Sequence, residues 1–203
     1  MSQRLDVHPT HPQPRILQAA AKVLKSGGLV VYPSDTTYAI ACEVGNKSAL
    51  DRLVALRRLK DGHQFSLACQ NLSELGTYAR VENTDFRLLK RNTPGAFTFI
   101  LNASRETPKR LVNPKKRTVG LRVPDHPIAQ GLLEAVGAPL ITTTMRLPDA
   151  EACMQDPHEI FTQLRTQIDL VLDGGIGGTE ESTVVDLTGE APDIVRQGVG
   201  QLL

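Results

Sequence analysis

Helix-type and strand-type hydrophobic patterns alternate along this chain, and that alternation limits the fold more than any other feature of the sequence. Apolar residues recur at helical spacing in the segments 16–24, 48–59, 72–78, 85–91, 128–136 and 156–167. Short apolar or alternating runs typical of strands occupy 29–32, 65–69, 97–101, 119–123, 139–144, 169–173, 183–187 and 193–197. This order predicts an α/β fold in which helices cover a twisted, open sheet. The last strand candidates follow one another closely, so we expect a mixed sheet.

The size and composition of the chain predict one domain over residues 1–203. These 203 residues suffice for one substantial core, and no repeat, linker or low-complexity segment divides them. Aromatic residues make up only 4% of the chain and tryptophan is absent, so Leu, Val, Ile and Ala must build the core. No stretch approaches the ~20 apolar residues that cross a bilayer, so we expect no membrane segment.

The cysteine spacing argues against a zinc-binding protein, and the net charge argues against a strongly basic nucleic-acid binder. Cys42, Cys69 and Cys153 are scattered, and no CxxC pair or His/Cys cluster has metal-ligand spacing. We therefore expect reduced structural thiols in a cytoplasmic protein without a metal site. The net charge is only +1, so a site for anions must come from local clustering of basic residues rather than from an overall basic chain.

Polar side chains stand at the ends of two predicted strands. Residues 34–37 (Ser-Asp-Thr-Thr) follow the strand that ends at Pro33, and ligands of open α/β sheets bind at strand ends. Their hydroxyls can bind a small polar molecule, with Asp35 orienting the loop; the alternative is a turn capped by Asp35. A second strand ends in three threonines, 142–144, followed by Arg146, which together resemble a cradle for a phosphate or carboxylate.

Basic residues gather in two segments. Arg57, Arg58 and Lys60 lie where a helix gives way to a loop, where they either complement the helix dipole or meet a polyphosphate. A second basic segment runs from 105 to 117 without periodicity, and is either a solvated surface loop or a phosphate-binding surface. Its last three residues are Lys115, Lys116 and Arg117.

Two further features lie in the second half of the chain. Alternation places Arg122 on the opposite side of its strand from its apolar neighbours, and an arginine on such a strand requires an anionic partner. The glycine-rich segment 173–181 lacks a Lys-Ser/Thr ending and a following helix, so it is neither a Walker loop nor a dinucleotide fingerprint. We interpret it as the long connection of a hairpin. Ser182 and Arg196 are the polar residues after it that we expect to matter.

Taken in order, these segments resemble one family. They are GG-LVVYPSDTTYAIACEV from Gly27, the basic helix end, NTPGAFTFIL (92–101), TVGLRVPDHP (118–127), PLITTT (139–144), STVVDL (182–187) and IVRQGVG (194–200). Each motif is modest, but their fixed order over nearly the whole chain is similar to the YrdC/YciO-like family of threonylcarbamoyl-AMP synthases and their relatives. YPSDTTYA, DGH and NTPG resemble the YciO branch in particular.

The resemblance implies an α/β fold with a basic concave face. The family's synthases are nucleotidyltransferases that combine L-threonine, bicarbonate and ATP into threonylcarbamoyl-AMP and release pyrophosphate. The product feeds the threonylcarbamoyladenosine modification of tRNA. Other members resemble binders of double-stranded RNA or tRNA. The resemblance thus implies ATP as a substrate that arrives with magnesium, and no tightly bound cofactor.

Residue roles follow from the same resemblance. It assigns threonine binding to Thr36, Arg122 and Ser182, and nucleotide binding to Thr118, Thr144 and Arg196. The basic residues add expectations of their own: Arg146 at the nucleotide, Arg57 and Lys60 in catalytic charge neutralisation, and contact with RNA phosphates by Arg58, Lys115, Lys116 and Arg117.

The chain departs from the synthase pattern at the phosphate end of the expected site. Synthases carry Lys-x-Arg where this chain has Arg57 and Leu59, and Ser-x-Asn where it has Thr144 and Arg146. Two hypotheses therefore stay open. The first is an enzyme that forms threonylcarbamoyl-AMP or a related acyl-adenylate; the second is a nucleotide, tRNA or double-stranded RNA binder that uses the same concave face with little turnover.

Overall fold

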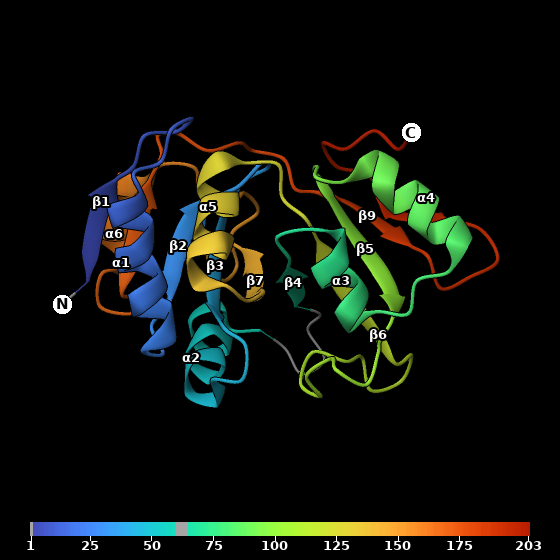
Figure 1. Cartoon of the computed structure of the whole chain (residues 1–203). Helices are drawn as coiled ribbons and strands as arrows, with labels where there is room; N and C mark the ends of the chain where they lie inside the picture. The colour runs from blue at the N-terminus through green and yellow to red at the C-terminus, as the bar shows by residue number, and fades with distance from the viewer. Residues whose placement is uncertain (1, 60–64) are drawn as a thin grey trace.

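The structure, a computed structural model, describes residues 2–59 and 65–203. The strands in these residues form one mixed ten-stranded sheet (Figure 1). In sheet order they are β1 (Gln3–Asp6), β8 (Leu170–Asp173), β2 (Val30–Pro33), β3 (Tyr38–Glu43), β7 (Leu140–Thr144), β4 (Ser66–Ala68), β6 (Thr118–Arg122), β5 (Phe97–Asn102), β9 (Thr183–Asp186) and β10 (Asp193–Arg196). Parallel pairs such as β2–β8 and β4–β6 occur beside antiparallel pairs such as β3–β7 and β5–β6. The predicted α/β fold with a mixed sheet is confirmed.

Four of the six described helices (α2, α3, α5 and α6) begin at a residue whose side chain caps them. The described helices are α1 (Pro14–Lys25), α2 (Lys47–Arg57), α3 (Leu72–Tyr78), α4 (Asn83–Asn92), α5 (Pro127–Val136) and α6 (Pro157–Leu164). Asp156 caps α6 by accepting from the His158 amide at 2.8 Å, and Pro157 takes the first helical position, as predicted. No helix in the described parts of the chain is long and apolar enough to cross a membrane.

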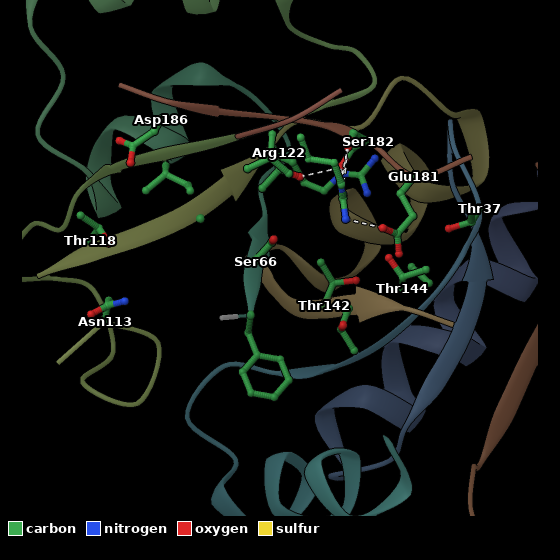
Figure 2. A pocket seen from close by; sticks show the side chains of 18 of the residues that line it. Thr37, Ser66, Asn113, Thr118, Arg122, Thr142, Thr144, Glu181, Ser182 and Asp186 are labelled. Carbon is green, nitrogen blue, oxygen red and sulfur yellow. Dashed lines mark hydrogen bonds and ion pairs between the residues drawn. The ribbon is translucent and has the colours of Figure 1, made fainter. Parts of the chain in front are cut away.

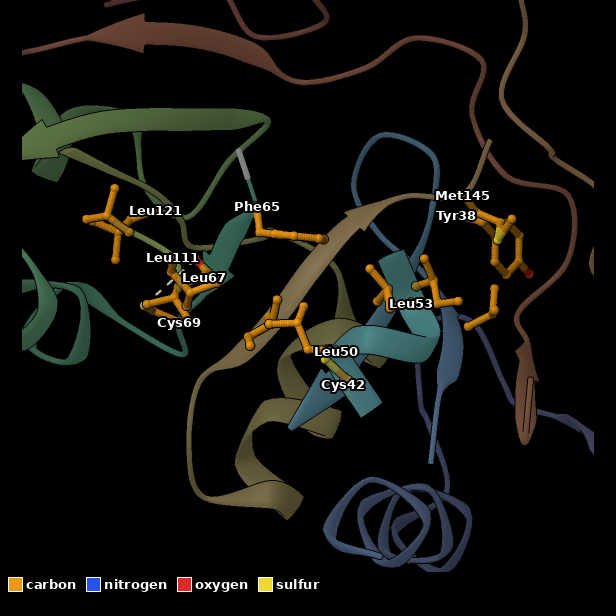
Figure 3. Packing of buried hydrophobic residues seen from close by; sticks show 14 of the residues in the cluster. Tyr38, Cys42, Leu50, Leu53, Phe65, Leu67, Cys69, Leu111, Leu121 and Met145 are labelled. Carbon is orange, nitrogen blue, oxygen red and sulfur yellow. Dashed lines mark hydrogen bonds between the residues drawn. The ribbon is translucent and has the colours of Figure 1, made fainter. Parts of the chain in front are cut away.

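Two hydrophobic cores lie on opposite faces of the sheet. Alternate strand residues such as Val30 and Ala41 pack with α1 and α5, which also pack against each other. The residues between them, such as Val31 and Ile40, belong to a larger core with α2, α3, α4 and α6. Figure 3 shows part of this larger core, where Leu50 of α2 lies close to Cys42 of β3. Because both faces are covered here, the strands are continuous apolar runs.

Three features differ from the sequence-based expectations. β1 was not predicted, because its four mostly exposed residues show no hydrophobic alternation; backbone pairing with β8 holds it. β3 was not predicted either, because its buried run directly follows the polar residues 34–37, which form only the short turn between β2 and β3.

The hairpin interpretation of the glycine-rich segment was wrong. β8 lies between β1 and β2, whereas β9 lies between β5 and β10, so residues 174–182 cross from one half of the sheet to the other. The glycines allow this strap to press against the 34–37 turn: a Cβ on Gly178 would meet the Thr36 carbonyl oxygen at 1.9 Å.

Candidate functional site

A pocket of about 380 Å³ lies over the polar side of β7, β4, β6, β5 and β9 (Figure 2). Its lining comes mainly from alternate residues of these strands, among them Thr142 and Thr144, Ser66, Thr118 and Arg122, Thr98 and Ile100, and Asp186, with Ser182 directly before β9. The intervening residues, such as Phe99 and Leu121, point into the larger core. Ala39 of β3 is paired with Thr144, so both side chains lie on the same face of the sheet, and Ala39 belongs to the core formed with α1 and α5. The pocket therefore lies on the face of the sheet that these two helices cover.

Arg122 is buried in this pocket and is paired with a carboxylate. Its Nη2 donates to Asp35 Oδ1, and the Asp125 amide donates to Asp35 Oδ2 at 3.0 Å. The expected anionic partner of Arg122 is therefore Asp35, from the turn after β2. The Arg122 Nε is buried and makes no hydrogen bond with any described residue. This leaves one buried donor for an acceptor that enters the pocket.

Ser182 and Arg196 are joined at the start of β9. The Ser182 hydroxyl is 2.9 Å from the Thr98 hydroxyl. Arg196 Nε and Nη2 donate to the Ser182 carbonyl oxygen at 3.1 and 2.8 Å, and Nη1 is paired with Glu181. The guanidinium of Arg196 thus fixes the chain that carries Ser182 and Glu181 into the pocket.

Arg57, the last residue of α2, lines the pocket, and no described residue forms a hydrogen bond or ion pair with it. The residue is 7% exposed, and its Nε makes no hydrogen bond with any described residue. Burial lowers the pKa of the Arg57 guanidinium, and the positive charge of Arg146 lowers it further. Arg146 in turn lies 4.0 Å from Glu181, the carboxylate that also holds Arg196. Among the described residues, Arg57 is therefore a buried cation that forms no ion pair, and the nearby carboxylate of Glu181 is already paired with Arg196.

The far end of the pocket is formed by a basic turn, residues 113–117. The Asn113 side chain accepts from the amides of Lys115 and Lys116, both at 2.9 Å, and Arg117 adopts a left-handed conformation with φ of 60°. Asn113, Lys116 and Thr118 line the pocket. The basic segment is thus locally ordered where it meets the pocket.

Several predicted residues lie elsewhere. Thr36 is buried and bonds to Ser34 Oγ at 3.1 Å, while its neighbour Thr37 lines the pocket. The exposed Arg58 lies 3.7 Å from Asp149. Arg117 lines a second cavity instead.

Lys115 is exposed in the basic turn and does not line the pocket. Lys60 lies outside the described residues.

The sequence interpretation missed several lining residues, chiefly Ser66, Thr98, Asn113, Glu181 and Asp186. Thr98 stands between Phe97 and Phe99, so the alternation that singled out Arg122 would also have found it. Glu181 had no such signal, because it lies outside β9 and its role depends on arginines from other segments.

The chain is similar in sequence and fold to several known proteins. Residues 22–198 match the Sua5/YciO/YrdC family model, described as "Telomere recombination". The uncharacterised protein YciO of Escherichia coli is 47% identical over 202 residues, which cover 100% of this chain and 98% of YciO. A crystal structure of E. coli YciO superposes with a TM-score of 0.95 over 99% of this chain and 98% of that one. A threonylcarbamoyl-AMP synthase of Vibrio vulnificus is 30% identical over 90% of this chain and 98% of its own. P. abyssi Sua5, crystallised with L-threonine, shares the fold with a TM-score of 0.88 at 24% identity, over 97% of this chain and 58% of its own.

Proposed function

This chain belongs to the Sua5/YciO/YrdC family, and from that premise we propose that its pocket binds a nucleotide beside an amino acid and forms threonylcarbamoyl-AMP or a closely related acyl-adenylate. The substrates would be L-threonine, bicarbonate and ATP, with magnesium arriving on the phosphates of ATP. The role is related to that of the threonylcarbamoyl-AMP synthases, and the choice of substrates is the proposal.

The observation that carries this proposal is the pair of buried Nε groups of Arg57 and Arg122 in one pocket, neither of which has a hydrogen-bond partner within residues 2–59 and 65–203. Unsatisfied buried guanidinium donors are costly, and an anionic ligand would satisfy them. Arg122 lies beside the carboxylate of Asp35, so the pair offers a cation to a carboxylate and an anion to an ammonium. A zwitterionic amino acid such as threonine suits that pair, with Ser182 as a further polar contact.

The proposed reaction needs positioning more than acid–base groups. The threonine nitrogen bonds to the carbon of bicarbonate with loss of water, and an oxygen of the resulting carbamate attacks the α-phosphorus of ATP. The bond from that phosphorus to the bridging oxygen then breaks, and pyrophosphate leaves. Arg57, Arg146 and Arg196 would neutralise the phosphate charge during this displacement.

A pyrophosphate-release assay tests the proposal. Release should require threonine and bicarbonate together, and Arg122→Gln should raise the KM for threonine by roughly tenfold or more, because a charge-assisted contact to its carboxylate is lost. Arg52→Gln is the matched control: this arginine pairs with Asp169 at 2.8 Å and does not line the pocket. Pyrophosphate that appears at the same rate without threonine would contradict the proposal.

A second candidate function, binding of tRNA or double-stranded RNA, is favoured by the basic turn. Its amide-capped conformation holds Lys115 and Arg117 at the surface while Lys116 lines the pocket. RNA helices are recognised largely through phosphate contacts and shape, which an ordered group of cations can supply. Filter binding at several salt concentrations distinguishes this function from nucleotide binding.

A further inference from the structure

Charge is distributed unevenly along the pocket. At one end stand Arg57, Arg146 and Arg196 with a single shared carboxylate, Glu181; we call these four residues the arginine cluster. Three positive charges and one negative charge leave this end with a net charge of +2. Arg122 adds nothing to that sum, because Asp35 neutralises it.

Glu181 does not satisfy the whole arginine cluster. It pairs closely with Arg196, whereas its oxygen lies 4.0 Å from Arg146, whose side chain is 41% exposed, so that second contact is weak. Arg57 is buried and its Nε has no partner among the described residues. The unmet charge is therefore concentrated between Arg57 and Arg146, where a compact dianion would be stabilised by charge-assisted hydrogen bonds.

The opposite end of the pocket is polar but electrically balanced. Lys116 and Asp186 lie there with Asn113 and Thr118. Figure 2 shows Asn113, Thr118 and Asp186 grouped at one side and Glu181 with Thr144 at the other. One carboxylate oxygen of Asp186 already accepts from the Thr188 amide and hydroxyl, which holds the side chain in place. Such an end suits an uncharged group with several hydrogen-bonding atoms, such as a nucleoside.

We propose that the preferred ligand of this pocket is a nucleoside 5′-monophosphate, with its phosphate dianion in the arginine cluster and its nucleoside toward Asn113, Thr118 and Asp186. The proposal rests on the proposed nucleotide pocket and narrows its substrate class. A phosphomonoester carries about −1.5 to −2 charges at pH 7, which matches the net +2 of the arginine cluster. A triphosphate adds further charge, yet Leu59, two residues beyond Arg57, is an apolar side chain packed on the core and supplies no cation for it.

Calorimetric titration with AMP, ATP, adenosine and inorganic phosphate tests this ligand class, with and without magnesium. AMP should bind at least tenfold more tightly than phosphate or adenosine, and at least as tightly as ATP under both conditions. Affinity for AMP should fall up to tenfold per pH unit below about pH 6, as the dianion takes up a proton. Arg57→Gln should weaken AMP at least tenfold and leave adenosine unchanged, whereas Arg52→Gln should change neither.

The contrary outcomes separate this inference from the proposed function. ATP binding tenfold more tightly than AMP would overturn the monophosphate assignment and leave the nucleotide pocket intact. Phosphate binding as tightly as AMP would also overturn it, because the nucleoside end would then contribute nothing. If none of the four probes binds, both the inference and the proposed function fail.

Discussion

If the chain forms threonylcarbamoyl-AMP as proposed, restoring the family pattern at three positions should make that reaction faster. The triple variant Arg57→Lys, Leu59→Arg, Arg146→Asn replaces the residues that differ from the synthase pattern at the phosphate end of the pocket. We expect pyrophosphate release that depends on threonine and bicarbonate to rise at least tenfold over the wild-type rate. The reason is that Leu59 cannot stabilise the charge that develops on the leaving pyrophosphate.

The magnitude follows from the contacts of these three residues. Removing one preorganised donor from an electrostatic site typically costs ~10²–10³ in rate, so an added arginine at position 59 has that much to recover. The change also costs stability: Leu59 packs on the larger core, so its replacement should lower the free energy of unfolding by roughly 1–2 kcal/mol. Arg146→Asn removes the neighbouring charge that lowers the pKa of residue 57 and frees Glu181 to pair with Arg196 alone.

The assay compares single and triple variants at saturating ATP, with unfolding curves to show that each variant folds. Arg58→Lys is the matched control, because the Arg58 side chain is 76% exposed and lies outside the pocket, so its rate should stay within about twofold of wild type. A wild-type rate equal to that of an authentic synthase would refute the reasoning. So would a triple variant that folds and binds ATP but gains no activity.

Three other predictions concern binding and stability. If the basic turn and its neighbours neutralise about four RNA phosphates, the affinity for RNA should fall on the order of a hundredfold between 50 and 200 mM salt. Alanine at the three cations of the turn should make this salt dependence less steep, and an unchanged salt dependence would mean that the turn is only a solvated surface. Gly178→Ala should lower the free energy of unfolding by about 1–3 kcal/mol in urea titrations, because its Cβ meets the Thr36 carbonyl, while Gly76→Ala in open space should not destabilise the protein. Burial raises the pKa of Cys42 to about 12 from 9.0, so the unfolded chain loses this thiol proton at a lower pH than the folded protein does. The contribution of the neutral thiol to the free energy of unfolding should therefore be fully present below pH 9 and fall by up to about 1.4 kcal/mol per pH unit from there to about pH 12. Cys42→Ala should make that decline less steep, and equal slopes would contradict the assignment.

The sequence predicted the fold well because most strands and helices carry their own periodicity. The exceptions have physical causes. β1 is held by backbone bonds to β8, which leave no side-chain pattern, and β3 is buried on both faces and starts directly at a polar turn. The path of the glycine strap depends on which strands are neighbours in space, and local pattern does not encode that.

The site could be predicted only in part, for a related reason. Strand alternation singled out Arg122, because an isolated charge on an apolar strand demands a partner, and Asp35 is that partner. It could not reveal that Glu181 neutralises Arg196 and only approaches Arg146, since these residues meet across three separate segments. Yet that shared carboxylate decides how much positive charge is left for a ligand. Replacing a neutral amide by Arg146 adds one charge to a pocket that has lost the cation expected at Leu59. The three positions therefore carry two positive charges in both patterns. In this chain the second positive charge lies at Arg146, on the wall beside Arg57, instead of at position 59, where the synthase pattern places it. With the proposed ligands, this redistribution would let one fold keep a nucleotide pocket and change which phosphate ester it prefers.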